Sequence, residues 1–418
     1  MTTNAELRRS VSGTKSRLGL IRLFLFFLFG ALAGYYWLLP VFVPPGRPLL
    51  IEGGLSIERV MRVAGVLLIF PLVMGRVFSF LSGERILRLT LWVFAVAPAT
   101  SLLFDPNMNF LIGTYGPFLA GGLALVCLSA LDQEEFTAWV AGIGLAATVF
   151  LILGLNQYGL ETTMFYGRPR SHIGFIHPTQ TASVIFLAGL FSIQFARWFL
   201  KRRRWLLWSA MGGIAAGMVF LLVAADSRST ALITFLIVSC AIYARVVKQP
   251  LARLGLVLAL LLAPLVGYAI AAFGDMQSEL WIALNSFSSY RFIIYRELAD
   301  TLSKASPLIA LVGPPLGSVG GGFASAESTY MSVYLNFGLL TLASLFIFLF
   351  MLGWRLSKAR RPLAYGCLCA AITFFAIDAQ GITPSNLAIF LLLVYAVRNA
   401  LSRSITTLRI RLNSRPVS

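Results

Sequence analysis

Apolar residues occur in long runs along this chain, separated by short polar and charged segments. A helix needs about 20 mostly apolar residues to cross the hydrocarbon core of a bilayer. Runs near that length lie at 20–43, 60–81, 88–104, 110–131, 136–156, 179–199, 205–225, 230–247, 254–273, 329–353, 363–381 and 384–400. The pattern predicts an all-α polytopic integral membrane protein with about twelve transmembrane helices.

The first run follows a basic N-terminal segment, as the apolar core of a signal peptide would. Ala31-Leu32-Ala33 even offers a small-residue cleavage pattern, but the run continues to Val43. That is longer than the roughly 7–15 residues of a signal's apolar core. We therefore expect an uncleaved first span and a single membrane domain over 1–418. Two long segments, 156–182 and 274–328, lie outside the spans, and the second has helical spacing.

Composition supports the membrane assignment. The chain is 58% hydrophobic and 12% charged, whereas soluble proteins average about 45–50% apolar and about 25% charged residues. These values exclude a soluble enzyme, a disordered scaffold and a secreted disulfide-rich domain. Cys127, Cys240, Cys367 and Cys369 all lie inside apolar runs, so we interpret them as small buried hydrophobic residues.

The net charge of +18 would suggest nucleic-acid binding in a soluble protein. Cytoplasmic loops of membrane proteins, however, are enriched in Lys and Arg. With both termini in the cytoplasm, 24 of the 34 basic residues fall in cytoplasmic segments. Most of the charge is therefore a topology signal, and we expect no nucleic-acid partner.

Nine basic residues fall on the opposite, outer side, where this rule does not explain them. They are Arg47, Arg59, Arg62, Arg168, Arg170, Arg228, Arg291, Arg296 and Lys304. Long ordered loops carry function more often than short connectors do. We therefore look for functional residues in the two long segments and in the turn between them.

In the first outer segment, Arg168 and Arg170 flank a proline and are followed by His172 and His177. Anchoring to lipid headgroups is the plain alternative for the arginines. The histidines are five residues apart with no carboxylate between them, which argues against a zinc site.

Arg228 lies in the turn between two spans, next to Asp226. A local pair with Asp226 is the structural alternative for this arginine. In the second outer segment, helical spacing from 289 to 303 places Arg291 and Tyr295 on one face. We expect Arg296 and Asp300 to form an ordinary surface pair. Arg291 is the better functional candidate.

Glu327 opens the tenth span. A carboxylate there interacts favourably with the helix dipole, but near arginines it is also a candidate general base. The planar guanidinium of arginine can donate two hydrogen bonds at once to phosphate oxygens. Arg170, Arg228 and Arg291 together with Glu327 therefore suit a reaction whose leaving group is a lipid pyrophosphate, and nothing in the set calls for a metal.

Four segments in this order resemble the O-antigen ligase and polymerase superfamily. GRPRSHIGFIHPTQTA resembles its Arg…Gly…(His/Asn)-Pro loop, and DSRSTALITFLIV its Ser-Arg-Ser turn entering a helix. SSYRFIIYRELADTLSKASPLIALVGPPLGS is similar to its long periplasmic segment. ESTYMSVYLNFGLLTLASLFIF resembles its (His/Asp/Glu)-x-x-Tyr pattern at the start of the next span. The resemblance covers about 160–350.

The resemblance implies a multi-pass enzyme of the bacterial inner membrane with its active site facing the periplasm. It would transfer a glycan from undecaprenyl pyrophosphate with inversion, without metal or cofactor. Glu327 and Arg291 would be catalytic, and Arg170, Arg228 and Arg291 would bind pyrophosphate. Further candidate substrate contacts are Arg168, His172, His177, Tyr295 and Tyr330.

Within the superfamily, the ligase branch, which attaches O-antigen to lipid A-core, typically has histidine where this chain has Glu327. That departure favours a Wzy-type polymerase, which joins lipid-linked repeat units of a polysaccharide. The expected partners are the lipid-linked donor, a glycan or lipid-linked acceptor, membrane lipids and a chain-length regulator protein.

A transporter or flippase for lipid-linked glycans is the alternative from another class, because twelve spans is a common transporter count. Transporters usually place ionisable residues near the bilayer midplane and show internal repeats. Arg62, Arg76 and Asp378 are the clear ionisable candidates inside the expected spans. A continuous polar path across the membrane would favour this alternative.

Overall fold

The computed structural model is mostly helical, as expected for an all-α membrane protein. It describes residues 4–39, 42, 69–103, 115–165, 168–175, 178–200, 203–225, 228–287, 291–304, 306–312, 328–377 and 387–413. Within these residues, seven helices are long and apolar enough to cross a membrane. They are Gly19–Leu38, Arg85–Leu103, Gln133–Tyr158, Gln180–Phe199, Arg204–Ala224, Pro250–Phe273 and Thr329–Ala359.

Four shorter apolar helices coincide with four more of the expected runs: Phe118–Ser129, Ala231–Val246, Pro362–Ala376 and Ala388–Leu401. The second expected run, 60–81, is described only from residue 69, where helix α3 (Phe70–Gly83) lies. The prediction of a mostly helical chain with helices able to span a membrane is confirmed, and the count of about twelve spans and their orientation stay predictions.

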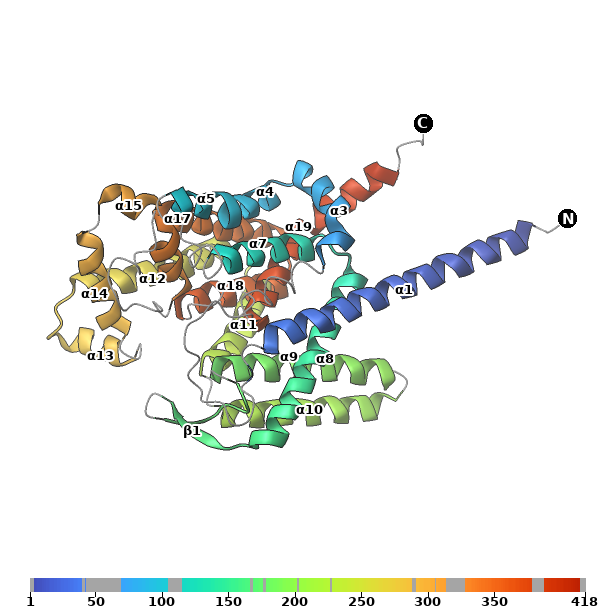
Figure 1. The fold of residues 1–418 in the computed structure, drawn as a ribbon, viewed down its shortest axis with the longest axis horizontal. Coiled ribbons are helices and arrows are strands. Elements are labelled where there is room, and N and C mark those ends of the chain that lie inside the picture. The colour runs from blue at the N-terminus through green and yellow to red at the C-terminus, as the bar shows by residue number, and fades with distance from the viewer. Residues whose placement is uncertain are drawn as a thin grey trace. The chain divides into compact units, whose positions relative to one another are not determined.

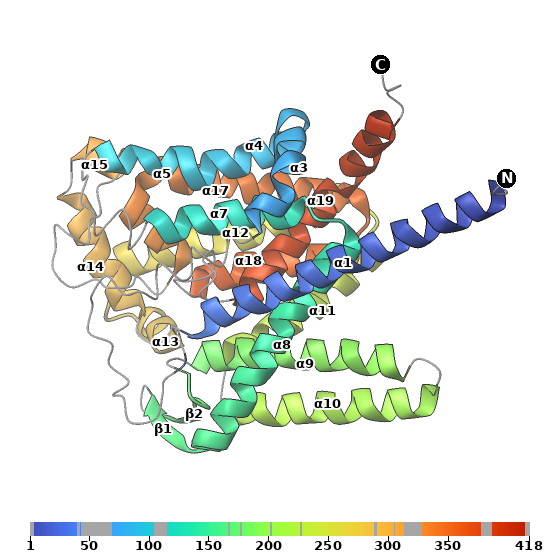
Figure 2. The same ribbon diagram turned by 45° about the vertical axis from the view of Figure 1, so that its right-hand side comes forward.

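The chain divides into two compact units, each built from two separate stretches of sequence. Unit 1 comprises Met1–Met74 and Ala130–Ser227, and unit 2 comprises Gly75–Ser129 and Arg228–Ser418. Figures 1 and 2 label their elements.

The described residues of unit 1 include four long helices and a β-hairpin. The helices are α1 (Asn4–Leu38), α8 (Gln133–Tyr158), α9 (Pro178–Phe199) and α10 (Arg204–Ala224), and the strands are β1 (Thr162–Phe165) and β2 (Arg168–Ser171). α1 packs against α8, α8 against α9, and α9 against α10. α9 and α10 run side by side as an antiparallel pair (Figures 1 and 2).

Glycines bring α1 and α8 close together. A Cβ atom at Gly30 would overlap the carbonyl oxygen of Trp139, and one at Gly142 would overlap that of Phe27. Close backbone approach through small residues is how helices associate inside membranes, where the bilayer supplies no hydrophobic driving force between them. The α1–α8 contact therefore depends on these two glycines.

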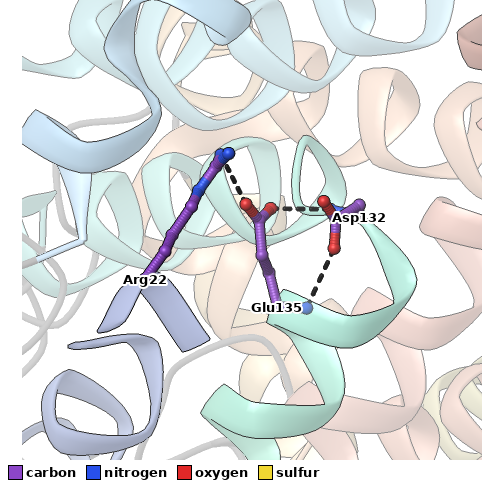
Figure 3. A network of polar contacts seen from close by, with 3 residues as sticks. All are labelled: Arg22, Asp132 and Glu135. Atoms are coloured by element: carbon purple, nitrogen blue, oxygen red, sulfur yellow. Dashed lines mark hydrogen bonds and ion pairs between the residues drawn. The ribbon is translucent and has the colours of Figure 1, made fainter. Parts of the chain in front are cut away.

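A polar network lies where α8 begins. Asp132 is the N-cap of α8: its side chain accepts from the N–H of Glu135, and the Glu135 side chain accepts from the N–H of Asp132, both at 2.9 Å. Glu135 also forms an ion pair with Arg22 of α1 (Figure 3). Glu135 is only 2% exposed, so its charge is compensated inside the protein.

In unit 2, helix α17 (Thr329–Ala359) packs against several others, and its residues Leu345, Phe348, Leu349 and Leu352 are completely buried. Its backbone leaves the helical conformation at Gly338, with φ 76°. A side chain is unfavourable at this φ, so glycine is the suited residue there. The neighbours of α17 include α12 (Pro250–Phe273), α15 (Pro307–Val312), α18 (Pro362–Ile377) and α19 (Leu387–Asn413).

The remaining helices of unit 2 pack around this core. α11 (Arg228–Val246) packs tightly on α18, because Gly366 leaves no space for a Cβ beside the carbonyl of Ile237. α7 (Gly116–Ser129) contacts α4 (Arg85–Leu91) and α19. The expected burial of Cys127, Cys240, Cys367 and Cys369 is confirmed, and all four thiols are free.

The helix that begins with α4 changes its winding before it ends. α4 continues as a π-helical turn, η2 (Trp92–Val96), then as α5 (Ala97–Ala99) and the 3-10 turn η3 (Thr100–Leu103). Pro98 has no N–H to donate to the preceding turn. The hydroxyl of Tyr115 donates to the carbonyl of Ala95, within the π-helical turn, at 2.9 Å.

Several basic residues form hydrogen bonds at one end of unit 2. Arg355 pairs with Glu84 at 2.9 Å. Arg253, 3% exposed, donates to the carbonyls of Val247 at 2.7 Å and Ser357 at 2.8 Å. These bonds join segments that the charge pattern assigns to one side of the membrane.

The long segment after α12 contains α13 (Glu279–Phe287), α14 (Arg291–Ser303) and α15. A hydrophobic cluster connects it to α12 and α17: Ala271, Trp281, Phe292, Tyr295, Leu298, Met331 and Leu335. The hydroxyl of Ser101 donates to the carbonyl of Val312 at 3.0 Å, so the end of η3 and the end of α15 lie together. The described part of this segment, 274–287, 291–304 and 306–312, is therefore folded onto the helices.

Candidate functional site

Arg170 lies on a β-hairpin that follows α8. β1 and β2 pair antiparallel, with Thr162 opposite Ser171 and Thr163 opposite Arg170. The side chain of Arg170 is half-buried. For Arg168, the first residue of β2, the structure describes the backbone. Backbone pairing therefore holds both arginines of the first outer segment in position.

His172 follows the hairpin directly and is half-buried. Its Nδ1 accepts a hydrogen bond from the N–H of Gly174 at 3.2 Å, and its carbonyl accepts one from the Thr181 hydroxyl at 2.7 Å. Burial lowers the pKa of the imidazole below its ordinary 6.5, and the carboxylate of Glu161 partly opposes this shift. The ring is therefore neutral at pH 7.

Glu161 is a charged neighbour that the sequence reasoning did not single out. It is exposed and lies one residue before β1, and it interacts electrostatically with His172. The ladder ends with Thr162 opposite Ser171, and Glu161 and His172 are the chain neighbours of these two residues. The signal in the sequence was a carboxylate between the end of an apolar run and the stretch that holds Arg168, Arg170 and His172.

The other predicted histidine, His177, lies outside the described residues. Helix α9 begins directly after it, at Pro178. Among the residues that the structure describes, no three His, Cys, Asp or Glu side chains lie close enough together to hold a metal ion.

Arg228 and Arg291 occupy equivalent positions in two helices of unit 2. Arg228 is the first residue of α11, and Arg291 is the first residue of α14. The structure describes the backbone of both residues. A cation at this position is unfavourable because the N-terminal end of a helix carries partial positive charge, and an anion there is stabilised.

Tyr295 and Tyr330 are both buried. Tyr295 is 9% exposed and belongs to the hydrophobic cluster that joins α14 to α12 and α17. Tyr330 is 1% exposed, and its hydroxyl donates to the carbonyl of Ile372 at 3.0 Å. Both environments favour packing roles over the predicted substrate contacts.

Arg296 does not act as expected. Its guanidinium donates to the carbonyl of Gly274 at 2.7 Å and thereby connects α14 to the end of α12. The expected pair with Asp300 is not among the salt bridges of the described residues. The reason is that the carbonyl after α12 has no partner within its own helix, and Arg296 can reach it.

The candidate residues divide between the two units. Arg168, Arg170 and His172 belong to unit 1, and Arg228, Arg291, Tyr295 and Tyr330 belong to unit 2. Glu327 lies in the sequence range of unit 2, outside the described residues. Comparisons with family models, with curated proteins and with solved structures found no match.

Proposed function

We propose that this protein is a glycosyltransferase that acts at the periplasmic face of the bacterial inner membrane. Its substrate is an oligosaccharide repeat unit on undecaprenyl pyrophosphate, and its product is a longer lipid-linked polysaccharide. The proposal is supported by the outer arginines and the carboxylate of Glu327, together with the resemblance of these segments to the polymerase superfamily.

One observation carries the proposal: two outer arginines stand at the first position of a helix, where the helix dipole disfavours them. An arginine at this position costs about 0.3–1 kcal/mol relative to a neutral residue. A bound phosphate group would reverse the sign of that effect, because it accepts hydrogen bonds from the helix N–H groups and from the guanidinium together.

In the proposed reaction, Glu327 removes the proton from an acceptor sugar hydroxyl. The hydroxyl oxygen attacks the anomeric carbon of the donor, on the face opposite the pyrophosphate. The bond from that carbon to the pyrophosphate oxygen breaks, and its electron pair leaves with the pyrophosphate. Arg228 and Arg291 of unit 2 stabilise the charge that develops there, and Arg170 of unit 1 is the third arginine that the resemblance assigns to pyrophosphate. The configuration at the anomeric carbon is inverted.

The test is complementation of a deletion strain with R170A, R291A and E327Q variants. Each variant should reach the membrane at the wild-type level and yield single repeat units without long-chain polymer. K304A is the matched control, because Lys304 is an exposed outer-side cation, and it should support normal polymer. Normal polymer from both arginine variants contradicts the proposal.

The material that accumulates in the deletion strain distinguishes a polymerase from a ligase and from a flippase. Loss of a polymerase leaves single repeat units, whereas loss of a ligase that transfers glycan to lipid A-core leaves long polymer unattached. Loss of a flippase traps the lipid-linked units on the cytoplasmic side of the membrane. The accumulated material, isolated from each side, identifies which of the three reactions is missing.

A further inference from the structure

Two buried cysteines of unit 2 face each other across a pair of helices. Cys240 belongs to α11 and Cys369 to α18, and they are 5% and 0% exposed. Their thiols share a hydrogen bond. Both thiols are free, and the proposed glycosyl transfer uses neither of them. Two thiols in contact have a chemistry that a single buried cysteine lacks, because their sulfur atoms can be oxidised to a disulfide.

The backbones of α11 and α18 approach each other closely beside this pair. A Cβ atom at Gly366 of α18 would overlap the carbonyl oxygen of Ile237 in α11 and would crowd the backbone nitrogen of Ala241. Cys240 lies between these two residues of α11, and Cys369 follows Gly366 by less than one helical turn. A disulfide requires Cα atoms that are usually about 4.4–6.8 Å apart. A glycine at this contact provides the close approach that such a bond requires.

A chain of hydrogen bonds directs the two sulfur atoms toward each other. The hydroxyl of Tyr365 donates to the carbonyl of Arg253 at 2.6 Å. Its oxygen therefore accepts in the hydrogen bond that it also shares with the Cys369 thiol. Because the proton of Cys369 is directed at Tyr365, the Cys369 sulfur accepts from the thiol of Cys240. The sulfur of Cys369 thus faces Cys240.

Both thiols lie well inside apolar helices. Tyr365 interacts electrostatically with Tyr243, and one turn further along α18 Cys369 bonds to Cys240, one turn earlier in α11. The two helices therefore run antiparallel. At about 1.5 Å per residue, Cys240 lies about 9 Å before the end of α11 and Cys369 about 10 Å after the start of α18. The pair is thus at one depth, away from the helix ends that water reaches.

The opposite face of α11 is exposed. Phe235, Val238 and Ile242 are exposed apolar side chains of this helix, which suit contact with lipid tails. Cys240 lies on the inner side of the same helix, behind a single layer of backbone. Local opening of one helix costs less than global unfolding. An oxidant that dissolves in the bilayer can therefore reach the pair from the side of α11.

We propose that Cys240 and Cys369 are an oxidation site, at which a lipid-soluble quinone converts the two thiols to a disulfide between α11 and α18. Two S–H bonds break and one S–S bond forms. The two electrons and two protons go to the quinone, which leaves as the quinol. The bond joins residues 129 positions apart, and closing so long a loop in the unfolded chain stabilises the folded state. The inference concerns unit 2 alone and does not depend on the proposed glycosyl transfer.

The test uses the reduced, full-length protein in phosphatidylcholine nanodiscs. One sample is treated with decylubiquinone, which enters the bilayer, and another with ferricyanide, which stays in water. Remaining thiols are alkylated, and mass spectrometry of the unreduced digest identifies linked peptides. We expect decylubiquinone to link Cys240 to Cys369 and to be consumed in equimolar amount with the bond. Ferricyanide should leave the four thiols reduced, and dithiothreitol should reverse the quinone reaction.

Variants distinguish the pair from the other two cysteines. C127S/C367S retains the pair alone and should form the same bond to the same extent. Cys367 is the matched control, since it is a buried thiol of the same helix as Cys369. Residues two positions apart on a helix do not face each other, so C240S should leave Cys369 unlinked and should consume no quinone.

A second pair of variants tests the helix contact. G366A separates α11 from α18 and should form the bond at least several-fold more slowly than the wild-type protein. G255A adds the same atom to α12, where nothing lies within 4 Å, and should react as the wild-type protein does. After oxidation the wild-type protein should unfold about 5–15 °C higher, whereas quinone should not change the unfolding temperature of C240S.

Four intact thiols in the wild-type protein after quinone treatment overturn the inference, whatever the variants show. A bond that includes Cys127 or Cys367 also overturns it. Equal oxidation by ferricyanide contradicts a lipid-soluble oxidant. An unfolding temperature that oxidation leaves unchanged contradicts the stabilising effect of the bond.

Discussion

Arg22 of α1 forms an ion pair with Glu135, the third residue of α8. Because the carboxylate of Glu135 also accepts from the N–H of Asp132, one buried side chain both caps a membrane helix and connects it to its neighbour. The two partners are 113 positions apart in the sequence, and the arginine is one of those that the positive-inside pattern already explains.

Replacing Arg22 should destabilise unit 1. In R22A the carboxylate of Glu135, 2% exposed, loses its cationic partner, and an uncompensated buried charged group costs about 1–3 kcal/mol or more. R22K keeps a charge within reach and should lose less. Thermal unfolding of the purified variants measures the effect, with R197A, an exposed arginine of α9, as the control. An R22A protein as stable as R197A contradicts this role.

A methyl group at Gly30 should separate α1 from α8. The added Cβ would overlap the backbone of Trp139, and overpacking of this kind costs about 1–3 kcal/mol, occasionally more. Gly19→Ala adds the same atom to the same helix, where nothing lies within 4 Å. We expect a lower unfolding temperature for G30A and an unchanged one for G19A. Equal unfolding temperatures would show that α1 does not pack closely here.

Replacing Arg253 should destabilise unit 2 where α12 begins. It is 3% exposed and donates to two backbone carbonyls, and each hydrogen bond to a charged group contributes about 1.5–3 kcal/mol. R253A should therefore unfold at a clearly lower temperature, and proteolysis should open the chain near 247–253. R245A removes an exposed arginine of the adjoining helix and should have little effect. Similar protease resistance in both variants would refute the prediction.

The stability of unit 1 should fall as the pH drops below 6.5. The pKa of His172 is lowered in the folded protein, so below pH 6.5 the unfolded chain binds a proton that the folded chain does not, and stability declines down to the folded pKa. H172N should remove this dependence. E161Q removes a carboxylate that raises the pKa of His172. The stability of this variant should therefore keep declining to a lower pH than that of the wild-type protein.

Unfolding temperatures between pH 8 and pH 4.5 measure this effect. His177 is the second of the two histidines, and H177N is the matched control, expected to retain the wild-type dependence on pH. The prediction is wrong if H172N and the wild-type protein lose stability in parallel.

Most of the helical architecture was predictable because it depends on local composition. A run of about 20 apolar residues satisfies its own backbone hydrogen bonds and partitions into lipid whatever its neighbours are. The helix α14 was also predictable, because its helical spacing is a local pattern, whereas Tyr295, which we expected to contact substrate, is buried. The cysteines within apolar runs were likewise predictable as buried residues.

The hairpin and the turn after it were not predicted. The segment 156–182 was expected only as a loop, because pairing Thr162 with Ser171 depends on two stretches meeting in space. The positive φ of Ile173 contradicts its own backbone preference. That conformation exists because α8 offers Gly154 beneath it and because α9 and Phe42 hold its sides.

Amino-acid order alone was therefore sufficient for the membrane class, most helices and the choice of outer arginines as candidate chemistry, since each follows from hydropathy or charge counted along the chain. Folding was needed to distinguish candidates of the same residue type. Arg296 is bound to a helix end and Tyr330 is enclosed, whereas Arg170 in β2 and His172 directly after it are half-buried. The physical reason is that a side chain's availability depends on which backbone groups and neighbours reach it, and these come from distant parts of the sequence.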